Sequence, residues 1–337
     1  MLDRLREICT VNGASGDESR VRNYIKAHIA ADEIITDNLG NLLVFKRGKK
    51  SPKNKIMLAA HMDEVGFMIT DITDDGFLRF GAVGGIDPRV VLGRGLELAS
   101  GVKGVVGTKA VHQQSAEERR KAPDFDELLL DIGAASRAEA EKFAARGDYA
   151  YFCGDFFGFG DGFIKGKALD DRAGCLIMMD MLNSELEYDA WFAFTVQEEV
   201  GTRGAKAAAF TIAPDISFVI ETTTACDISG VSGDKKVCEL GGGAVVSFMD
   251  RGTVYDRELY GLAFEMAGQN KIPIQTKTLV AGGNDSGAIH VSRGGVRTCA
   301  MSLPCRYLHS PSCVIKESDY GAVRSLAEKM LSAAAEL

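Results

Sequence analysis

Five side chains of types that bind divalent metal ions stand out in this sequence, although they lie far apart along the chain. They are two histidines and three acids: His61, Asp170, Glu199, Glu221 and His309. Each lies where a predicted strand meets a loop or a helix, so a folded α/β sheet could bring all five together. Two imidazoles, two terminal carboxylates and one bridging carboxylate are the ligands that two zinc-like ions about 3.5–4 Å apart require. The pattern predicts a two-metal hydrolase that activates water.

Two further acids have positions that suit supporting roles. Asp63 follows His61 by two residues, and a carboxylate at that spacing can orient the imidazole and fix its tautomer. Glu198 precedes Glu199 after the predicted strand AWFAFTVQ, where adjacent side chains diverge. One acid can then bind metal while the other acts as a general base. In isolation, a loop histidine, a helix cap and a solvated acidic pair are all common, but their joint occurrence at strand ends favours a site.

The remaining histidines and one glycine-rich segment fit this site less well. We assign His28, His112 and His290 to structural positions on a helix face, in the middle segment and after a glycine-rich turn. The segment GGNDSG at 282–287 lacks the Lys-Ser/Thr pair of a phosphate-binding loop. Asp285, within it, is a candidate contact for a substrate amine.

The pattern of predicted elements changes twice along the chain. Ser15 and Glu18 have the spacing of a capping box, which predicts the start of a helix. The run IMLAA suits a strand buried on both faces of a largely parallel sheet. From about 66 to 162, short β-prone stretches alternate with Gly and Asp clusters, interrupted by a helix at a Ser136–Glu139 capping box. This middle segment predicts a small barrel or sandwich, here taken as a small β-barrel.

After position 162, strands and helices alternate again, which implies a sheet covered by helices on both faces. We therefore predict an α/β fold with a mixed, mostly parallel sheet flanked by helices. Residues 1–65 and 163–337 form its catalytic domain, and residues 66–162 form an inserted β domain that serves oligomerisation.

Composition excludes several classes of partner. The formal net charge of −8 argues against nucleic acid, because phosphate binding relies on clustered Lys and Arg. No apolar run approaches the roughly 20 residues that span a bilayer. The N-terminal stretch MLDRLREICTVNG lacks the apolar core of a signal peptide, and the eight cysteines form no CxxC pair. The sequence therefore predicts a cytoplasmic protein with reduced cysteines.

Five motifs of the chain match a known family in order and spacing. HMDEVGF, KALDDRAG, QEEVGTRGA, GGNDSG and RYLHSP resemble the tetrahedral (TET) aminopeptidases of metallopeptidase family 42. That family includes glutamyl aminopeptidases and proteins once labelled cellulase M. The resemblance covers essentially the whole chain, including the segment inserted between the first and second motifs.

The resemblance implies a ligand set for two divalent ions per subunit, zinc or cobalt. His61 and Glu221 would hold one ion, Glu199 and His309 the other, and Asp170 would bridge them. Manganese is a further possibility, because O and N ligands accept all three metals. One position departs from the family, in which Asp often stands where this chain has Glu221, in the segment ETT. A Glu reaches about one methylene further and can still act as a ligand, although metal affinity can differ.

The resemblance also implies the reaction and the assembly. Glu198 would be the general base that takes a proton from a water bridging the two metals, and Asp63 would support His61. The substrates would be peptides with a free N-terminus, from which N-terminal residues are removed. Family members use the inserted β domain to self-associate, commonly into a homo-oligomeric dodecamer.

Three alternatives remain open from the sequence. Another metal-dependent amide hydrolase would use the same ligands. A glycoside hydrolase would suit the Glu198–Glu199 pair, although glycosidases normally need no metal, and one Trp with 8% aromatic residues offers little sugar-stacking surface. A scaffold protein with relic catalytic residues would suit the inserted domain, but no ligand or base position is lost. Sensitivity to a chelator separates the metal-dependent peptidase from the glycoside hydrolase.

Overall fold

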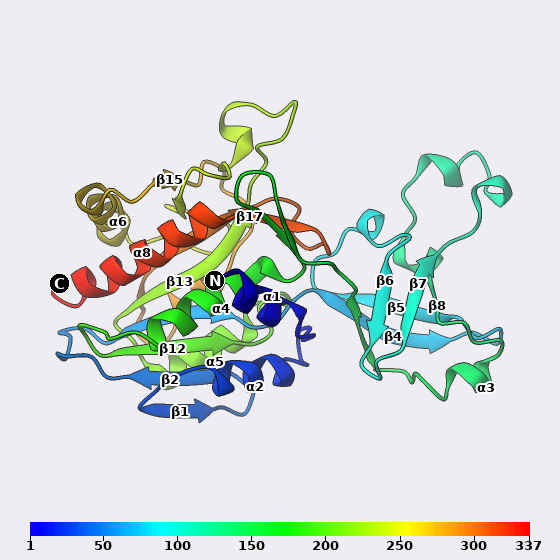
Figure 1. Ribbon diagram of the computed structural model, residues 1–337, viewed down its shortest axis with the longest axis horizontal. Helices are drawn as coiled ribbons and strands as arrows, with labels where there is room; N and C mark the ends of the chain where they lie inside the picture. The colour runs from blue at the N-terminus through cyan, green and yellow to red at the C-terminus, as the bar shows by residue number, and fades with distance from the viewer.

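The computed structural model describes all 337 residues, which form an α/β body and a closed β-barrel (Figure 1). The body contains an eight-stranded sheet in the order β1-β2-β12-β3-β13-β16-β14-β15. The pairs β12–β3, β3–β13, β13–β16 and β14–β15 are parallel, and the other three are antiparallel. The strands are β1 (Glu33–Thr36), β2 (Leu42–Lys46), β3 (Ile56–His61), β12 (Ala190–Thr195), β13 (Ile216–Thr224), β14 (Ala244–Val246), β15 (Ile274–Thr276) and β16 (Arg297–Cys305).

Alternating side chains along the central strands explain why helices cover both faces. On β3, Leu58 packs into the larger core, together with residues of α1, α2, α4, α6 and α8. Its neighbour Met57 packs on the opposite face against α5 and α7. These helices are α1 (Leu2–Thr10), α2 (Ser19–Ala27), α4 (Leu169–Leu182), α5 (Arg203–Ile212), α6 (Arg257–Asn270), α7 (Ser286–Ile289) and α8 (Glu317–Ala334). The predicted mixed, mostly parallel sheet with helices on both sides is confirmed.

The barrel closes in the order β4-β5-β8-β7-β6-β9 and has its own apolar core. Its strands are β4 (Gly66–Ile72), β5 (Leu78–Val83), β6 (Gly95–Leu98), β7 (Lys103–Gly107), β8 (Leu129–Asp131) and β9 (Tyr149–Phe152). Helix α3 (Arg137–Ala140) begins at Ser136, whose side chain accepts from the Glu139 N–H as the capping box predicts. Short 3-10 helices occur at Pro88–Val90, Val111–Gln113, Glu118–Arg120 and Phe125–Glu127. The predicted small barrel is confirmed, while the exact domain limits stay a prediction.

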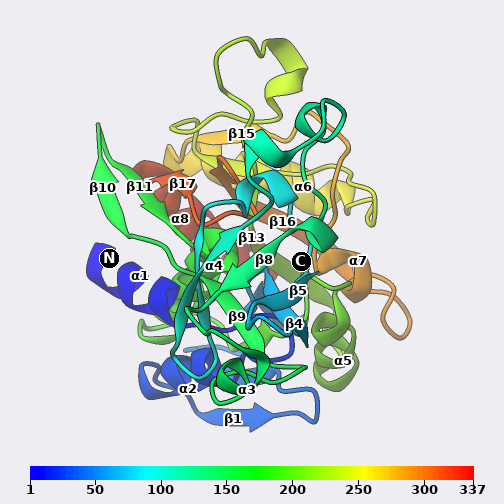
Figure 2. The ribbon, with the colours of Figure 1, turned by 90° about the vertical axis from the view of Figure 1, so that its right-hand side faces the viewer.

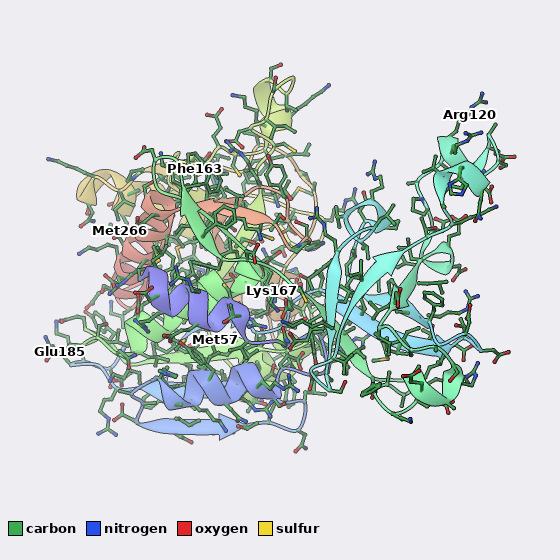
Figure 3. The ribbon with its side chains drawn as sticks, turned by 45° about the vertical axis from the view of Figure 1, so that its right-hand side comes forward. Met57, Arg120, Phe163, Lys167, Glu185 and Met266 are labelled. Carbon is green, nitrogen blue, oxygen red and sulfur yellow. The ribbon has the colours of Figure 1, made fainter.

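The barrel stands at one end of the body. Strand β3 leads almost directly into β4, so the barrel adjoins the edge of the sheet at which β3 ends (Figures 1 and 2). Figure 3 places Lys167 near the junction of the two parts and Arg120 at the far tip of the barrel. No helix combines the length and the apolar composition that crossing a membrane needs.

The structure adds local detail at three places. Helix α2 begins at Ser19 rather than at Ser15, whose hydroxyl binds Asp63 instead. Strand β13 does not end at Glu221 but continues to Thr224, because β16 pairs with it as far as Cys305. The stretch after β9 leaves the barrel, and β10 (Phe157–Phe159), β11 (Phe163–Gly166) and β17 (Cys313–Lys316) form a separate three-stranded sheet.

Candidate metal centre at the carboxyl edge of the sheet

The carboxyl ends of three adjacent parallel strands deliver most of the predicted site. His61 is the last residue of β3, and the register pairs it with Thr195 at the end of β12. On the other side, Ala59 pairs with Val219, and continuing that register brings Glu221 beside His61. Open α/β sheets place their sites at this edge because the strand ends release side chains there into a shared crevice.

The first group of potential ligands is buried. The His61 Nε2 atom lies 3.3 Å from Asp170 Oδ1 and 3.4 Å from Glu221 Oε1. These three atoms lie within 4.8 Å of one another, close enough for one ion to contact all of them. Asp170 comes from the start of α4, while the carboxylate of its neighbour Asp171 accepts the Gly174 N–H at 3.0 Å within the same helix.

A second group shares Asp170 with the first. His309 lies in the loop between β16 and β17, and its Nε2 atom is 3.2 Å from Glu199 Oε2 and 3.7 Å from Asp170 Oδ2. Asp170 therefore turns one carboxylate oxygen to each histidine. All five sequence-predicted ligand positions converge in two triads with one common member.

Asp63 organises the loops between these triads. Its carboxylate accepts the Ser15 hydroxyl at 2.6 Å and the main-chain N–H groups of Glu198 and Glu199 at 3.0 and 3.1 Å. The His61 Nδ1 atom lies 3.0 Å from the Asp63 carbonyl oxygen and 3.5 Å from its carboxylate. The carbonyl is the better aligned acceptor, so Asp63 supports His61 through its main chain and fixes the two glutamates through its side chain.

The crowding of buried acids indicates that this edge is built for cations. Burial, with the nearby Asp170 charge, raises the pKa of Glu221 to about 8, although His61 opposes the shift. Burial and the Asp170 charge likewise raise the pKa of Glu199 well above its usual range. Buried carboxylates of like charge are stabilised by positive charge placed between them. With two imidazoles and three carboxylates, the residues present fit two divalent ions.

Glu198 faces the same cavity without joining either triad. It lines a cavity of about 720 Å³ together with His61, Asp170 and His309. Burial raises the pKa of the Glu198 carboxyl well above its usual range, and the charges of Glu221 and Asp285 add to this effect while His61 opposes it. A carboxyl in this environment exchanges protons more readily near neutral pH than a solvated one.

The barrel contributes support that the sequence did not reveal. The His309 Nδ1 atom lies 2.7 Å from the carbonyl oxygen of Gly85, just after β5. Gly84 has φ +94°, and a Cβ there would lie 2.9 Å from Val65 Cγ1 and 3.3 Å from Glu199 Cβ. This close approach requires glycine. The only available signal was the Gly-Gly pair in GAVGGID, which has no motif of its own.

Other sequence candidates lie elsewhere. The prediction that Asp285 contacts a substrate amine is wrong: the side chain is buried, and its Oδ2 atom accepts the Thr195 hydroxyl at 2.5 Å. His28 stacks on Tyr24, and the His290 Nδ1 atom lies 2.8 Å from the Ser286 carbonyl oxygen, as structural roles predict.

Comparisons with known proteins place the chain in a family. The model described as M42 glutamyl aminopeptidase matches residues 40–326. A protein of Acetivibrio thermocellus is 41% identical over 333 residues, covering 97% of this chain and 98% of that one. The lysyl aminopeptidase of Pyrococcus furiosus is 33% identical over 309 residues, covering 89% and 87%.

A solved structure resembles this chain in both fold and sequence. The Pyrococcus horikoshii TET1 peptidase, which can assemble into a tetrahedron or a large octahedral shell, superposes with a TM-score of 0.86 at 34% identity, covering 97% of this chain and 98% of that one. The family match spans both the body and the barrel. The chain therefore belongs to the M42 glutamyl aminopeptidase family of metal-dependent peptidases.

Proposed function

We propose that this protein is a two-metal aminopeptidase that removes the N-terminal residue from peptides. One observation carries the proposal: the two oxygens of Asp170 face two separate His–Glu pairs. A single-metal site would need only one such pair. Family membership supports the peptidase activity and the use of divalent metal.

The ligand assignment follows from these distances. His61 and Glu221 would hold one ion, Glu199 and His309 the other, and Asp170 would bridge them. When bound by these residues, two divalent ions (zinc, cobalt or manganese) would supply Lewis-acid chemistry, lowering the pKa of water and polarising a carbonyl oxygen.

Glu198 would carry the proton in this reaction. Its carboxylate faces the cavity beside both triads, so it can accept the proton of the attacking water and return it to the leaving amine. Asp63 would keep Glu198 and Glu199 in place through their N–H groups. The acidic surroundings would also attract the positively charged N-terminus of a substrate.

The proposed role of Glu198 is tested by substitution. Glu198→Gln keeps the shape of the side chain but cannot accept a proton, so we expect kcat to fall by about 10²–10⁴-fold. Bound metal, measured by elemental analysis, should stay at two ions per chain. The matched control is Glu185→Gln, at an exposed position far from the site (Figure 3). Loss of metal along with activity would show that Glu198 is a ligand instead.

Metal removal tests the reaction class. Protein stripped by a chelator should lose turnover of aminoacyl-p-nitroanilides and regain it when zinc, cobalt or manganese is added back. Full restoration should require two equivalents of metal per chain. Restoration by one equivalent would contradict the two-metal proposal, and unchanged activity after stripping would contradict metal dependence altogether.

A further inference from the structure

The cavity beside the metal centre has two chemically different ends. At one end lie the acids and histidines of the two triads. The other end is formed by residues after Glu221 on β13, by the 3-10 helix η5 (Gly233–Lys236) and its flanks, and by the segment after β15. Only five of the 26 lining residues are hydrophobic, so this cavity is better suited to a polar side chain than to a large apolar one.

The far end carries the only two lysines that line the cavity, Lys235 and Lys277, and no arginine lines it. They come from adjoining segments, because the Thr278 N–H donates to the Val237 carbonyl at 3.0 Å. The segment with Lys235 stands out from the body near β15 (Figures 1 and 2). Lys235 itself is exposed. Lys277 is half-buried and therefore lies deeper in the wall.

Lys277 has no anionic partner within the chain. Its Nζ atom donates one hydrogen bond, to the Ala281 carbonyl at 2.9 Å, and neither Lys277 nor Lys235 takes part in any of the ion pairs of the structure. An ammonium group has three N–H donors, so two remain free at Lys277. Burial lowers the pKa of Lys277, and the charges of Asp250 and Glu221 oppose that shift. A half-buried, unpaired cation is stabilised when a carboxylate enters beside it.

We propose that this end of the cavity binds the side chain of the first substrate residue and that Lys277 selects Glu or Asp there. The inference rests on the proposed aminopeptidase function, since the metal centre must hold the scissile bond at the other end. Lys277 is the specificity-determining residue, and Lys235 adds a second positive charge at the entrance.

Sequence similarity does not decide this preference. One relative, 33% identical, is a lysyl aminopeptidase, whereas the matching family model is named for glutamyl substrates. In this chain a substrate lysine would place a third ammonium beside Lys277 and Lys235, and neither Asp250 nor Asp234 lines the cavity to accept it. Like charges in a partly desolvated site repel, so the lining itself opposes a lysyl preference.

Selectivity can be measured with a panel of p-nitroanilides. For the metal-loaded protein, kcat/KM should be highest for Glu or Asp, and Glu should exceed its uncharged isostere Gln by roughly 10- to 100-fold, as expected for a charge-assisted hydrogen bond. Lys should be the poorest substrate. This comparison needs no variant, so it decides the inference even if substitutions impair folding.

Variants then test the assigned residue. Lys277→Met should collapse the Glu-to-Gln ratio of kcat/KM to within about threefold, and Lys277→Glu should invert the preference toward Lys. Lys206, exposed on α5 and outside the cavity, gives the matched controls Lys206→Met and Lys206→Glu, for which the ratio should not change.

The outcomes separate this inference from the proposed function. If Leu and Ala p-nitroanilides are cleaved but Glu is no better than Gln, the aminopeptidase stands and the selectivity inference is wrong. If no p-nitroanilide is cleaved by the metal-loaded protein, the proposed function itself fails. Lys277 could instead bind the C-terminal carboxylate of short peptides. In that case Lys277→Met would slow dipeptides more than dipeptide amides and leave the Glu-to-Gln ratio of the p-nitroanilides unchanged, which would also overturn the inference.

Discussion

The Asp63 carboxylate accepts more hydrogen bonds than an amide of the same shape could. One oxygen accepts the Ser15 hydroxyl and the Glu199 N–H, and the other accepts the Glu198 N–H. Hydrogen bonds and the charge of His61 hold the pKa of Asp63 below its usual value even though burial raises it. The surrounding hydrogen-bond donors therefore stabilise the charged form of the Asp63 carboxylate.

Replacing this carboxylate should loosen metal binding without removing a ligand. In Asp63→Asn, an NH₂ group would replace one carboxylate oxygen and would face hydrogen-bond donors that it cannot accept from. The turns that carry Glu198 and Glu199 would therefore shift. We expect metal affinity to fall by about 10- to 100-fold, the range typical of groups that orient metal ligands. Competition with a fluorescent chelator measures this change. Ser15→Ala removes only one of the hydrogen bonds and should have a smaller effect; unchanged affinity in Asp63→Asn would contradict the role of Asp63.

The predicted ligand positions converge where chemistry and strand position agreed, while their roles stay a prediction; a local prediction failed where a polar residue had two possible partners. The five ligand candidates all follow or end buried strands or begin a helix, and the structure brings them together. Ser15 has the spacing of a helix cap, but its hydroxyl donates to Asp63, 48 residues away. Local spacing carries no information about such a distant acceptor.

At the scale of elements, Arg172 ties helix α4 to the N-terminal segment. It is completely buried, and its guanidinium donates to the carbonyl oxygens of Ile8, Val11 and Gly13 and to that of Met62, just after β3. Three of these acceptors lie in the N-terminal segment, and the fourth, Met62, directly precedes Asp63. Arginine suits this position because its planar guanidinium group presents five N–H donors in fixed directions.

Loss of this guanidinium should destabilise the fold. Arg172→Met fills a similar volume but leaves buried carbonyl groups without donors, so we expect the free energy of unfolding to fall by about 3–5 kcal/mol. Urea unfolding of the metal-free protein measures the difference. Arg257→Met, at an exposed position at the start of α6, is the control. A loss no larger than that of the control would show that water or neighbouring donors replace the guanidinium.

Element types were largely predictable, whereas element lengths and partners were not. Apolar alternation identified the central strands, because both faces of the sheet are buried. The extension of β13 past Glu221 depends on pairing with β16, about 80 residues later in the sequence. For the same reason, the barrel order β4-β5-β8-β7-β6-β9 could not be derived from local pattern.

At the scale of the whole molecule, the barrel exposes apolar side chains that a solitary chain would leave in water. Val105 is 56% exposed, Val111 66% and Phe143 44%. Exposed apolar side chains can contribute to a surface at which chains associate when they form one patch. The TET1 relative assembles into a tetrahedron or an octahedral shell. A tetrahedral shell with one chain at each equivalent position holds twelve copies.

We propose that this chain self-associates through the inserted domain, and a tetrahedral assembly would contain twelve chains of 36.2 kDa. Light scattering coupled to size exclusion measures that mass directly. It should persist on dilution, because association through apolar surface buries area that water would otherwise cover. A mass of one chain at all concentrations would contradict the proposed role of the inserted domain.

The contact between His309 and the Gly85 carbonyl means that the barrel cannot be exchanged as an independent module. A chimera in which a foreign insert replaces the barrel would lose the Gly85 carbonyl oxygen, which orients the His309 imidazole. It would also remove the glycine whose bare backbone leaves room for Glu199. A working splice must retain the turn after β5 from the recipient, so the metal centre and this part of the inserted domain are inherited together.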